Sequence, residues 1–292
     1  MRLSDGLLLV CVLLPCVLSG CEQKSVAPTP AAQDDGKANV AAQRIVSLAP
    51  GLTELIYAVG AESNLLATVE WSDYPEAAKQ VPRIGDAFRV DLEKLLALKP
   101  DLVLAWTSGT PATTVASIKA LGLRVESIDA EHLADIGGSL LRVGELTGKT
   151  AQAQQAAQQF EQGIEQLRAQ YAGVRQLSTF IEVNRQPLYT VNGRHVLSEA
   201  VNLCGGSNVF ADLNQLAPVI GVEAVLKADP EVILSTDGTL AENQKDWQSW
   251  PQLRASKQHV YAVSPDTTTR ATPRLLQGAQ EICAALQQAR TP

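Results

Sequence analysis

Two segments of the chain that lie 130 residues apart carry the same residue pattern. The first is EKLLALKPDLVL at 93–104, and the second is EAVLKADPEVIL at 223–234. Each predicts a short helix that starts at an acidic residue, stops before a proline and leads into a buried strand. The matching positions are Glu93, Leu96, Pro100, Val103 and Leu104, paired with Glu223, Leu226, Pro230, Ile233 and Leu234. Two similar lobes would explain this repeat, although helix-proline-strand units also recur by chance in α/β folds.

The chain around the first repeat alternates strand patterns with helical ones. Strands are expected at 45–48, 65–71, 101–106 and 124–128, and helices between them at 53–59, 92–98 and 112–121. The alternation resumes with a strand at Thr179–Val183. This pattern is typical of a parallel sheet covered by helices.

A long helix is expected between the two repeats. The stretch Thr150–Tyr171 lacks proline, is rich in Ala, Gln and Glu, and carries on one face Phe160, Ile164, Leu167 and Tyr171. Such a helix would extend roughly 30 Å and either join two lobes or form one more surface helix of a single domain. With the repeat, it predicts an α/β protein of two similar α/β lobes joined by a single long helix. The expected boundaries are 44–149 for the N-terminal lobe, 150–172 for the connecting helix and 173–292 for the C-terminal lobe.

The first twenty residues predict an export signal. Arg2 precedes the apolar run Gly6–Leu18, which is too short to span a bilayer. The following Leu18–Cys21 segment (LSGC) resembles the lipobox of bacterial lipoproteins, which implies removal of 1–20 and lipidation of Cys21. A plain secretory signal with a chance cysteine is the alternative. Residues 21–43 contain almost no large apolar side chains and predict a lipidated flexible tether. We therefore expect a periplasmic or cell-surface protein that is anchored to the membrane by lipid.

Cysteine usage fits this compartment. Cys11 and Cys16 would leave with the signal and Cys21 would carry lipid, so only Cys204 and Cys283 remain in the folded body. Exported proteins favour pairing of such cysteines, which predicts one disulfide. Two free buried thiols are the alternative.

The net charge and the absence of catalytic motifs limit the range of possible functions. The chain has 24 Lys and Arg against 31 Asp and Glu, a formal net charge of -7, which opposes binding to nucleic acid. It contains no Gly-x-Ser-x-Gly elbow, no His-Glu-x-x-His helix and no Gly-x-x-x-x-Gly-Lys phosphate loop. The three histidines, His132, His195 and His259, lack metal-ligand spacing. We expect no metal site, no cofactor and no enzyme activity, with an exported hydrolase built from distant residues as a remaining alternative.

Aromatic residues follow several of the expected strands. Ligands of open α/β sheets bind beyond the carboxyl ends of the strands. The residues near such ends are Trp71, Trp106, Tyr189, Trp247 and Trp250. Aromatic residues are only 4% of the chain, so this placement suggests flat apolar walls for a large ligand, although each of them is equally explained by ordinary packing.

Short motifs between Arg44 and the C-terminus carry a family resemblance. They are Arg44–Pro50 with Thr53–Leu55, Ser72–Pro75, the segment 91–101, Cys204–Gly206 with Asn208, and Arg270–Ala271 with Pro273–Arg274. In these motifs the chain resembles the cobalamin-binding component of bacterial vitamin importers. That component lies within the class of binding proteins that also serves haem and ferric siderophores. The resemblance implies two α/β lobes joined by one long helix.

The resemblance also implies roles for individual residues. The ligand-binding residues would be Trp71, Phe88 and Trp106 in the first lobe and Tyr189 and Trp250 in the second. Cys204 and Cys283 would be the family disulfide pair. Glu93 and Glu223 would dock onto arginines of an ABC importer permease dimer, although acids in the first turn of a helix also favour its dipole.

The expected function is capture of cobalamin or a related corrinoid between the lobes and delivery to an ABC importer. The chain departs from the family pattern where Phe88 replaces a tryptophan and where Asp266–Thr269 (DTTT) replaces aromatic residues. Both changes reduce the apolar surface that the expected ligand site offers to its ligand. The same role for haem or a ferric siderophore is therefore the alternative, and the cargo would be a transported ligand rather than a cofactor.

Overall fold

The computed structural model describes residues 40–86 and 88–291. The expected signal peptide at 1–20, the lipidation site Cys21 and nearly all of the expected tether lie outside the described residues. Ala42 is buried, and its N–H donates to the Leu146 carbonyl oxygen at 2.8 Å. The folded body therefore begins slightly before the expected boundary at Arg44.

The first sheet has four parallel strands in the order β2-β1-β3-β4. Its strands are β1 (Ile45–Ser47), β2 (Leu65–Ala67), β3 (Leu102–Trp106) and β4 (Val125–Ile128). On one face pack α1 (Pro50–Ala58) and α4 (Asp135–Thr147), and on the other pack α2 (Leu92–Ala97) and α3 (Ala112–Ala120). Short 3-10 helices lie at η1 (Glu62–Asn64) and η2 (Glu76–Gln80).

The second sheet repeats this arrangement with the parallel order β6-β5-β7-β8. Its strands are β5 (Leu177–Glu182), β6 (Gly206–Asn208), β7 (Val232–Ser235) and β8 (Val260–Ala262). One face is covered by α6 (Val196–Leu203) and α10 (Leu275–Arg290), and the other by α7 (Val222–Ala228) and α8 (Leu240–Gln248). The remaining short elements are η3 (Ala255–Lys257) and α9 (Pro265–Thr268).

The sequence repeat occupies equivalent places in the two sheets. The first copy forms α2 and β3, and the second forms α7 and β7. Both strands are third in their sheet order, and both helices cover the corresponding face. Chance similarity does not account for this correspondence, so the expectation of two similar lobes is confirmed.

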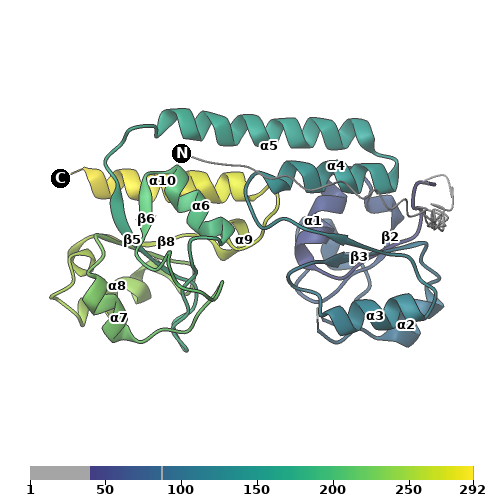
Figure 1. The fold of residues 1–292 in the computed structure, drawn as a ribbon, viewed down its shortest axis with the longest axis horizontal. Coiled ribbons are helices and arrows are strands. Elements are labelled where there is room, and N and C mark those ends of the chain that lie inside the picture. The colour runs from purple at the N-terminus through teal and green to yellow at the C-terminus, as the bar shows by residue number, and fades with distance from the viewer. Residues whose placement is uncertain (1–39, 87, 292) are drawn as a thin grey trace, which may run out of the picture. The chain divides into compact units, whose positions relative to one another are not determined.

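The long helix α5 (Thr150–Gln170) connects the two lobes and lies along α4 and α10 (Figure 1). Its buried residues alternate with polar ones at helical spacing. Phe160 and Ile164 pack in the apolar cluster of the first lobe, whereas Leu167 packs in that of the second. One rigid element thus contributes to both cores.

The expected strand at 65–71 is too long. Strand β2 ends at Ala67, and the chain then turns, so that Trp71 has a φ of 66°. Residues other than glycine seldom adopt this left-handed backbone conformation, and a residue that does adopt it interrupts the pairing of a strand. Trp71 therefore lies in a loop rather than at the end of a strand.

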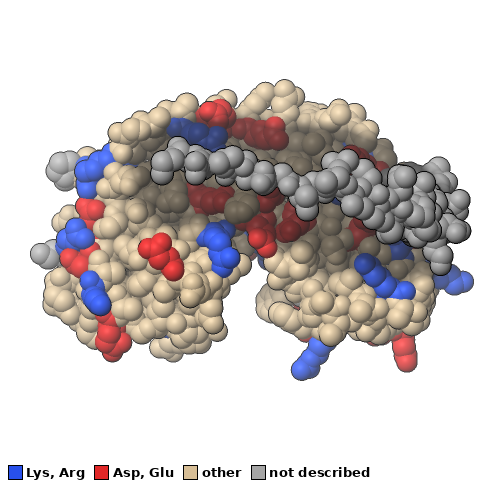
Figure 2. All heavy atoms as spheres, viewed as in Figure 1, with Lys and Arg blue, Asp and Glu red and all other residues tan. Residues whose placement is uncertain are grey.

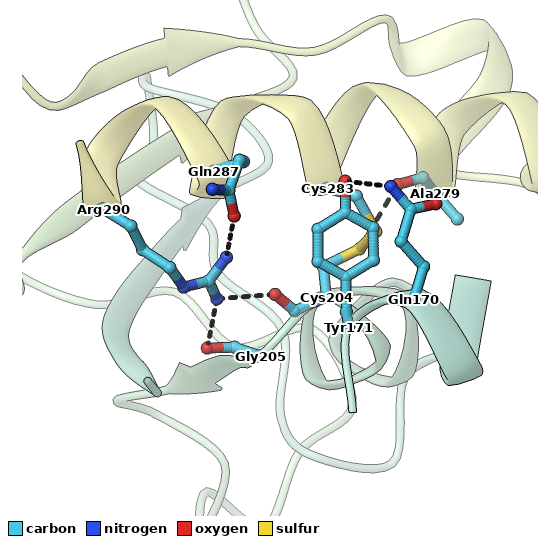
Figure 3. Close-up of a disulfide and its surroundings, with 8 residues drawn as sticks. All are labelled: Gln170, Tyr171, Cys204, Gly205, Ala279, Cys283, Gln287 and Arg290. Carbon is cyan, nitrogen blue, oxygen red and sulfur yellow. Dashed lines mark hydrogen bonds between the residues drawn. A yellow bond between two sulfur atoms is a disulfide. The ribbon is translucent and has the colours of Figure 1, made fainter. Parts of the chain in front are cut away.

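A disulfide joins Cys204, which follows α6, to Cys283 in α10 (Figure 3). Both cysteines are buried. Beside it, Arg290 donates to the carbonyl oxygens of Cys204 and Gly205 at 2.7 and 3.0 Å. Gly205 has a φ of 75°, and a Cβ there would lie 2.4 Å from Cγ2 of Val174, so the turn requires glycine. Pairing is thus the correct choice over two free thiols.

Within residues 40–86 and 88–291, no helix is both long and apolar enough to cross a bilayer. Acidic and basic side chains alternate over the face drawn in Figure 2, and the surface is hollowed between the two lobes. Such a hollow is a common place for a small-molecule site.

Candidate functional site

Two of the expected ligand-binding residues extend into solvent from loops of the first lobe. Trp71 is 74% exposed and Phe88 is 72% exposed. The Trp71 carbonyl oxygen accepts a hydrogen bond from Nη2 of Arg270 at 3.2 Å, which ties this loop to the second half of the chain. The N–H groups of Phe88 and Arg89 donate to Asp86, and these bonds lower the pKa of the Asp86 carboxyl. Fixed loops thus present two large aromatic faces.

Trp106 is the last residue of β3 and is half-buried. Its indole N–H donates to Oγ of Ser108 at 2.8 Å, and its backbone N–H donates to Oγ1 of Thr110 at 3.0 Å. Gly109 passes so close to the ring that a Cβ there would lie 3.1 Å from Cδ1 of Trp106. The loop therefore holds the indole in one orientation.

The second lobe contributes aromatic residues of two kinds. Trp250 is 36% exposed, and Tyr189 is half-buried in a backbone bridge with Val219. Trp247 instead belongs to the core: it is 4% exposed, its indole N–H donates to Oε2 of the buried Glu182 at 2.7 Å, and its ring packs edge-on against a phenylalanine. Trp247 is therefore not a ligand wall, and ordinary packing accounts for it.

The lobes meet at Glu54, which the sequence did not single out as a contact between them. This carboxylate from α1 is 4% exposed and accepts from Nη1 of Arg270 at 2.8 Å and Oγ1 of Thr272 at 2.7 Å. Nη1 of Arg274 lies 3.5 Å away, and the Arg274 guanidinium stacks 3.8 Å from the ring centroid of Tyr74. Residues from several family-like motifs thus form one polar cluster between the lobes.

A second contact between the lobes is made by an acidic side chain of the second lobe, which reaches residues of the first lobe. Glu199 of α6 pairs through Oε1 with Nδ1 of His132 and accepts from the Leu133 N–H at 2.8 Å through Oε2. The nearby carboxylate raises the pKa of His132 above its usual value. This contact, like the Glu54 cluster, joins the two lobes.

At 267–269, where the family resemblance leads us to expect aromatic residues, three threonines expose little side-chain surface to a ligand. Thr267 and Thr268 are 3% and 0% exposed, and both hydroxyls donate to the Ser264 carbonyl oxygen. The hydroxyl of Thr269 donates to the Pro265 carbonyl oxygen at 2.6 Å. Thr269 lines a cavity between the lobes, beside Trp106.

Glu93 and Glu223 lie at equivalent places in the first turns of α2 and α7. Both side chains are exposed and form no ion pair with the residues that the structure describes. The helix dipole favours an acid at either place. Their exposure leaves both carboxylates available to a partner.

The three histidines have separate environments. His195 caps α6, accepting the Leu197 N–H at Nδ1, and burial lowers its pKa to about 4. His259 lies against Tyr261, and His132 pairs with a carboxylate as described above. None forms a hydrogen bond to a serine hydroxyl or a thiol in the described part of the chain, which also contains no cluster of three or more metal-ligating side chains.

Two similar α/β lobes joined by one connecting helix define a bilobal solute-binding protein. The chain belongs to the periplasmic binding protein family, whose model matches residues 45–261. Proteins of this family capture solutes outside the cytoplasm, and the relatives described next are binding proteins rather than enzymes.

The most informative relatives are two vitamin B12 binders. The vitamin B12-binding protein of Yersinia pestis (strain Pestoides F) is 38% identical over 253 residues, which are 86% of this chain and 89% of the relative. The crystal structure of the periplasmic vitamin B12 binding protein BtuF of Vibrio cholerae matches with a TM-score of 0.80 at 33% identity, covering 86% of this chain and 99% of that one. The periplasmic haem binding protein HutB of Vibrio cholerae matches with a TM-score of 0.72 over 84% of this chain and 98% of that one, but at 21% identity it shows the shared fold alone.

Proposed function

We propose that this protein captures cobalamin or a related corrinoid between its two lobes and delivers it to an ABC importer. The observation that supports the proposal is a set of large aromatic side chains left open to solvent, namely Trp71, Phe88 and Trp250. Large aromatic side chains are normally well buried, and their exposure costs free energy that a flat apolar ligand would recover. The two vitamin B12 binders among the relatives support a corrinoid as this ligand.

In this proposal the ligand lies between Trp71, Phe88 and Trp106 on one side and Tyr189 and Trp250 on the other. Covering one exposed aromatic side chain contributes about 1.5–3 kcal/mol. Loss of one such contact should weaken binding by about tenfold to hundredfold.

Calorimetric titration of the purified protein with cyanocobalamin tests the assignment, with haem and a ferric hydroxamate as competitors. Trp71→Ala and Trp250→Ala should weaken corrinoid binding by the amount given above. Tyr171→Ala is the matched control, because Tyr171 directly follows α5 and packs on the second-lobe core near the disulfide (Figure 3). Unchanged affinity in both tryptophan variants would remove these walls from the site.

We infer that the protein acts by capture and not by catalysis. The environments of His132, His195 and His259 favour this interpretation, because each has a structural contact and none forms a hydrogen bond to a serine hydroxyl or a thiol of the described residues. If the parent protein shows no hydrolytic activity, and replacing His132 and His259 leaves corrinoid transport intact, the hydrolase alternative is removed.

We further propose that residues 1–20 are a signal peptide and that a lipid on Cys21 anchors the protein to the membrane through a tether ending near 43. The LSGC motif and the polar composition after it support this proposal. Metabolic labelling with a fatty acid should mark the parent protein but not Cys21→Ala. Equal labelling of both would exclude lipidation at this residue.

A further inference from the structure

A small cavity of about 110 Å³ lies between the lobes, next to Trp106. Part of its wall is apolar, formed by Trp106 and Leu216 among others. Three ionisable side chains also line it: Glu131 from the loop after β4, and Arg194 and His195 from the loop before α6. Since one water molecule needs only about 10–15 Å³ of such volume, the cavity has room for a short side group of a ligand.

His195 provides a hydrogen-bond donor to this cavity. Its Nδ1 accepts the backbone N–H of Leu197 at 3.1 Å, which places the ring proton on Nε2. Because burial lowers the pKa of the ring to about 4, the imidazole is neutral at pH 7 and keeps that tautomer. No described residue accepts a hydrogen bond from Nε2. A neutral donor is therefore open to a ligand.

Arg194 and Glu131 provide one further donor and one acceptor. Nη2 of Arg194 donates to the Asn214 carbonyl oxygen at 2.7 Å, which leaves its other guanidinium N–H groups unused by the described residues. The Glu131 carboxylate is exposed and forms no hydrogen bond or ion pair with any residue that the structure describes, Arg194 included. An ionised carboxylate accepts hydrogen bonds and donates none.

We propose that this cavity is a subsite for a primary carboxamide on the periphery of the ligand. The amide oxygen accepts from Nε2–H of His195 and from Arg194, while the amide NH2 donates to Glu131. A carboxylate in the same place would have no proton to donate and would meet the negative charge of Glu131. Glu131 is thus the residue that makes the protein prefer amidated corrinoids over ligands bearing free carboxylates.

This inference rests on the proposed corrinoid function and deepens it. The test uses cyanocobalamin and its separated monocarboxylic acid derivatives, in each of which one peripheral amide is hydrolysed. The parent protein should bind at least one of these derivatives about tenfold to hundredfold more weakly than cyanocobalamin, the expected effect of losing a charge-assisted hydrogen bond.

Glu131→Gln identifies the residue responsible. Its uncharged amide can donate to a carboxylate, so the penalty against that derivative should fall to about threefold or less. Glu62→Gln is the matched control, because Glu62 is an exposed acid on η1 that is not among the residues lining this cavity, and it should keep the full penalty.

The possible results distinguish failure of the carboxamide subsite from failure of the corrinoid function on which it rests. If the parent binds cyanocobalamin but discriminates against none of the monocarboxylates, or if Glu131→Gln keeps the full penalty, the carboxamide subsite is wrong and the corrinoid function stands. If the parent binds no corrinoid, the proposed function itself is wrong.

Discussion

Replacing Glu54 with alanine would remove the most extensive polar contact between the lobes. The Glu54 carboxylate accepts hydrogen bonds from Arg270 and Thr272 at 2.8 and 2.7 Å, with Arg274 at 3.5 Å. Its own side chain is 3% exposed, whereas those of the two arginines are 25% and 18% exposed. The variant would therefore leave two guanidinium groups without their shared counter-charge.

The size of the effect follows from this burial. Removing one partner of a buried ion pair costs about 3–5 kcal/mol, because the remaining charge is left uncompensated. Thr272 is fully buried, so its hydroxyl would also lose its acceptor, which costs a further 1–3 kcal/mol when counted alone. The two costs overlap, and water reaches part of both guanidinium groups, so we expect Glu54→Ala to lower the free energy of unfolding by about 4 kcal/mol. Glu54→Gln keeps an acceptor and should lose about half as much.

Urea unfolding followed by far-ultraviolet circular dichroism measures both variants. Glu62→Ala is the control, because the Glu62 side chain is exposed and makes no hydrogen bond or ion pair to the residues that the structure describes. Its free energy of unfolding should change by no more than about 0.5 kcal/mol. A loss below about 1 kcal/mol in Glu54→Ala would refute the reasoning, since it would mean that the cluster contributes no more than an exposed ion pair.

Three further predictions follow from other parts of the structure. Replacing Cys204 and Cys283 with alanine opens a loop spanning 79 residues and should lower the free energy of unfolding by about 4.5 kcal/mol in the chain-entropy model; urea unfolding that matches the oxidised parent would contradict this. His195 has a folded-state pKa of about 4 against 6.5 in the unfolded chain, so the unfolded chain binds its proton first and stability falls by about 3 kcal/mol as the pH drops from 6.5 to 4. His195→Asn keeps an N-cap acceptor and should lose that component of the pH dependence, and an unchanged profile would assign it to other groups. The double variant Glu93→Lys and Glu223→Lys should abolish stimulation of a cognate importer ATPase while leaving corrinoid affinity unchanged, whereas normal stimulation would limit both acids to the helix dipole.

Local sequence signals predicted much of the fold. The repeat at 93–104 and 223–234 depends on prolines that stop helices and on apolar runs that enter sheets, and both are local effects. The apolar spacing of Phe160, Ile164 and Leu167 likewise follows from a single helix face. Element types were therefore well predicted where burial pattern and stop signals agreed.

The incorrect strand at 65–71 shows where such signals fail. The run up to Trp71 is apolar enough for a strand, but hydrogen bonds from the loop backbone to Pro82 and Gly85 replace strand pairing after Ala67. Helix α4 was not predicted at all, because its glycines at 137, 138 and 144 lower helix propensity. Gly144 lies against Ala153 of α5, where a Cβ would come within 2.3 Å, so close helix packing decides this residue.

The site divides in a similar way. Exposed aromatic residues could be selected from the sequence because tryptophan is rare here and follows the expected strands. The Glu54 cluster could not be predicted from the sequence, because it joins residues more than two hundred positions apart. Nothing in the sequence distinguishes a glutamate that will be buried from an exposed one until its partners are known. Trp247 shows the converse limit, because its burial and its hydrogen bond to Glu182 distinguish a core tryptophan from a ligand wall, and neither can be seen in the sequence.

The most direct test of the central claim is the affinity of the purified protein for cyanocobalamin, measured by isothermal titration with haem and a ferric hydroxamate as competitors. The proposed function predicts one-to-one binding at submicromolar dissociation constant, which corresponds to more than about 8 kcal/mol, and no displacement by either competitor. Absence of corrinoid binding, together with tight binding of haem or the ferric chelate, would contradict the corrinoid assignment and leave a periplasmic binding protein with a different cargo.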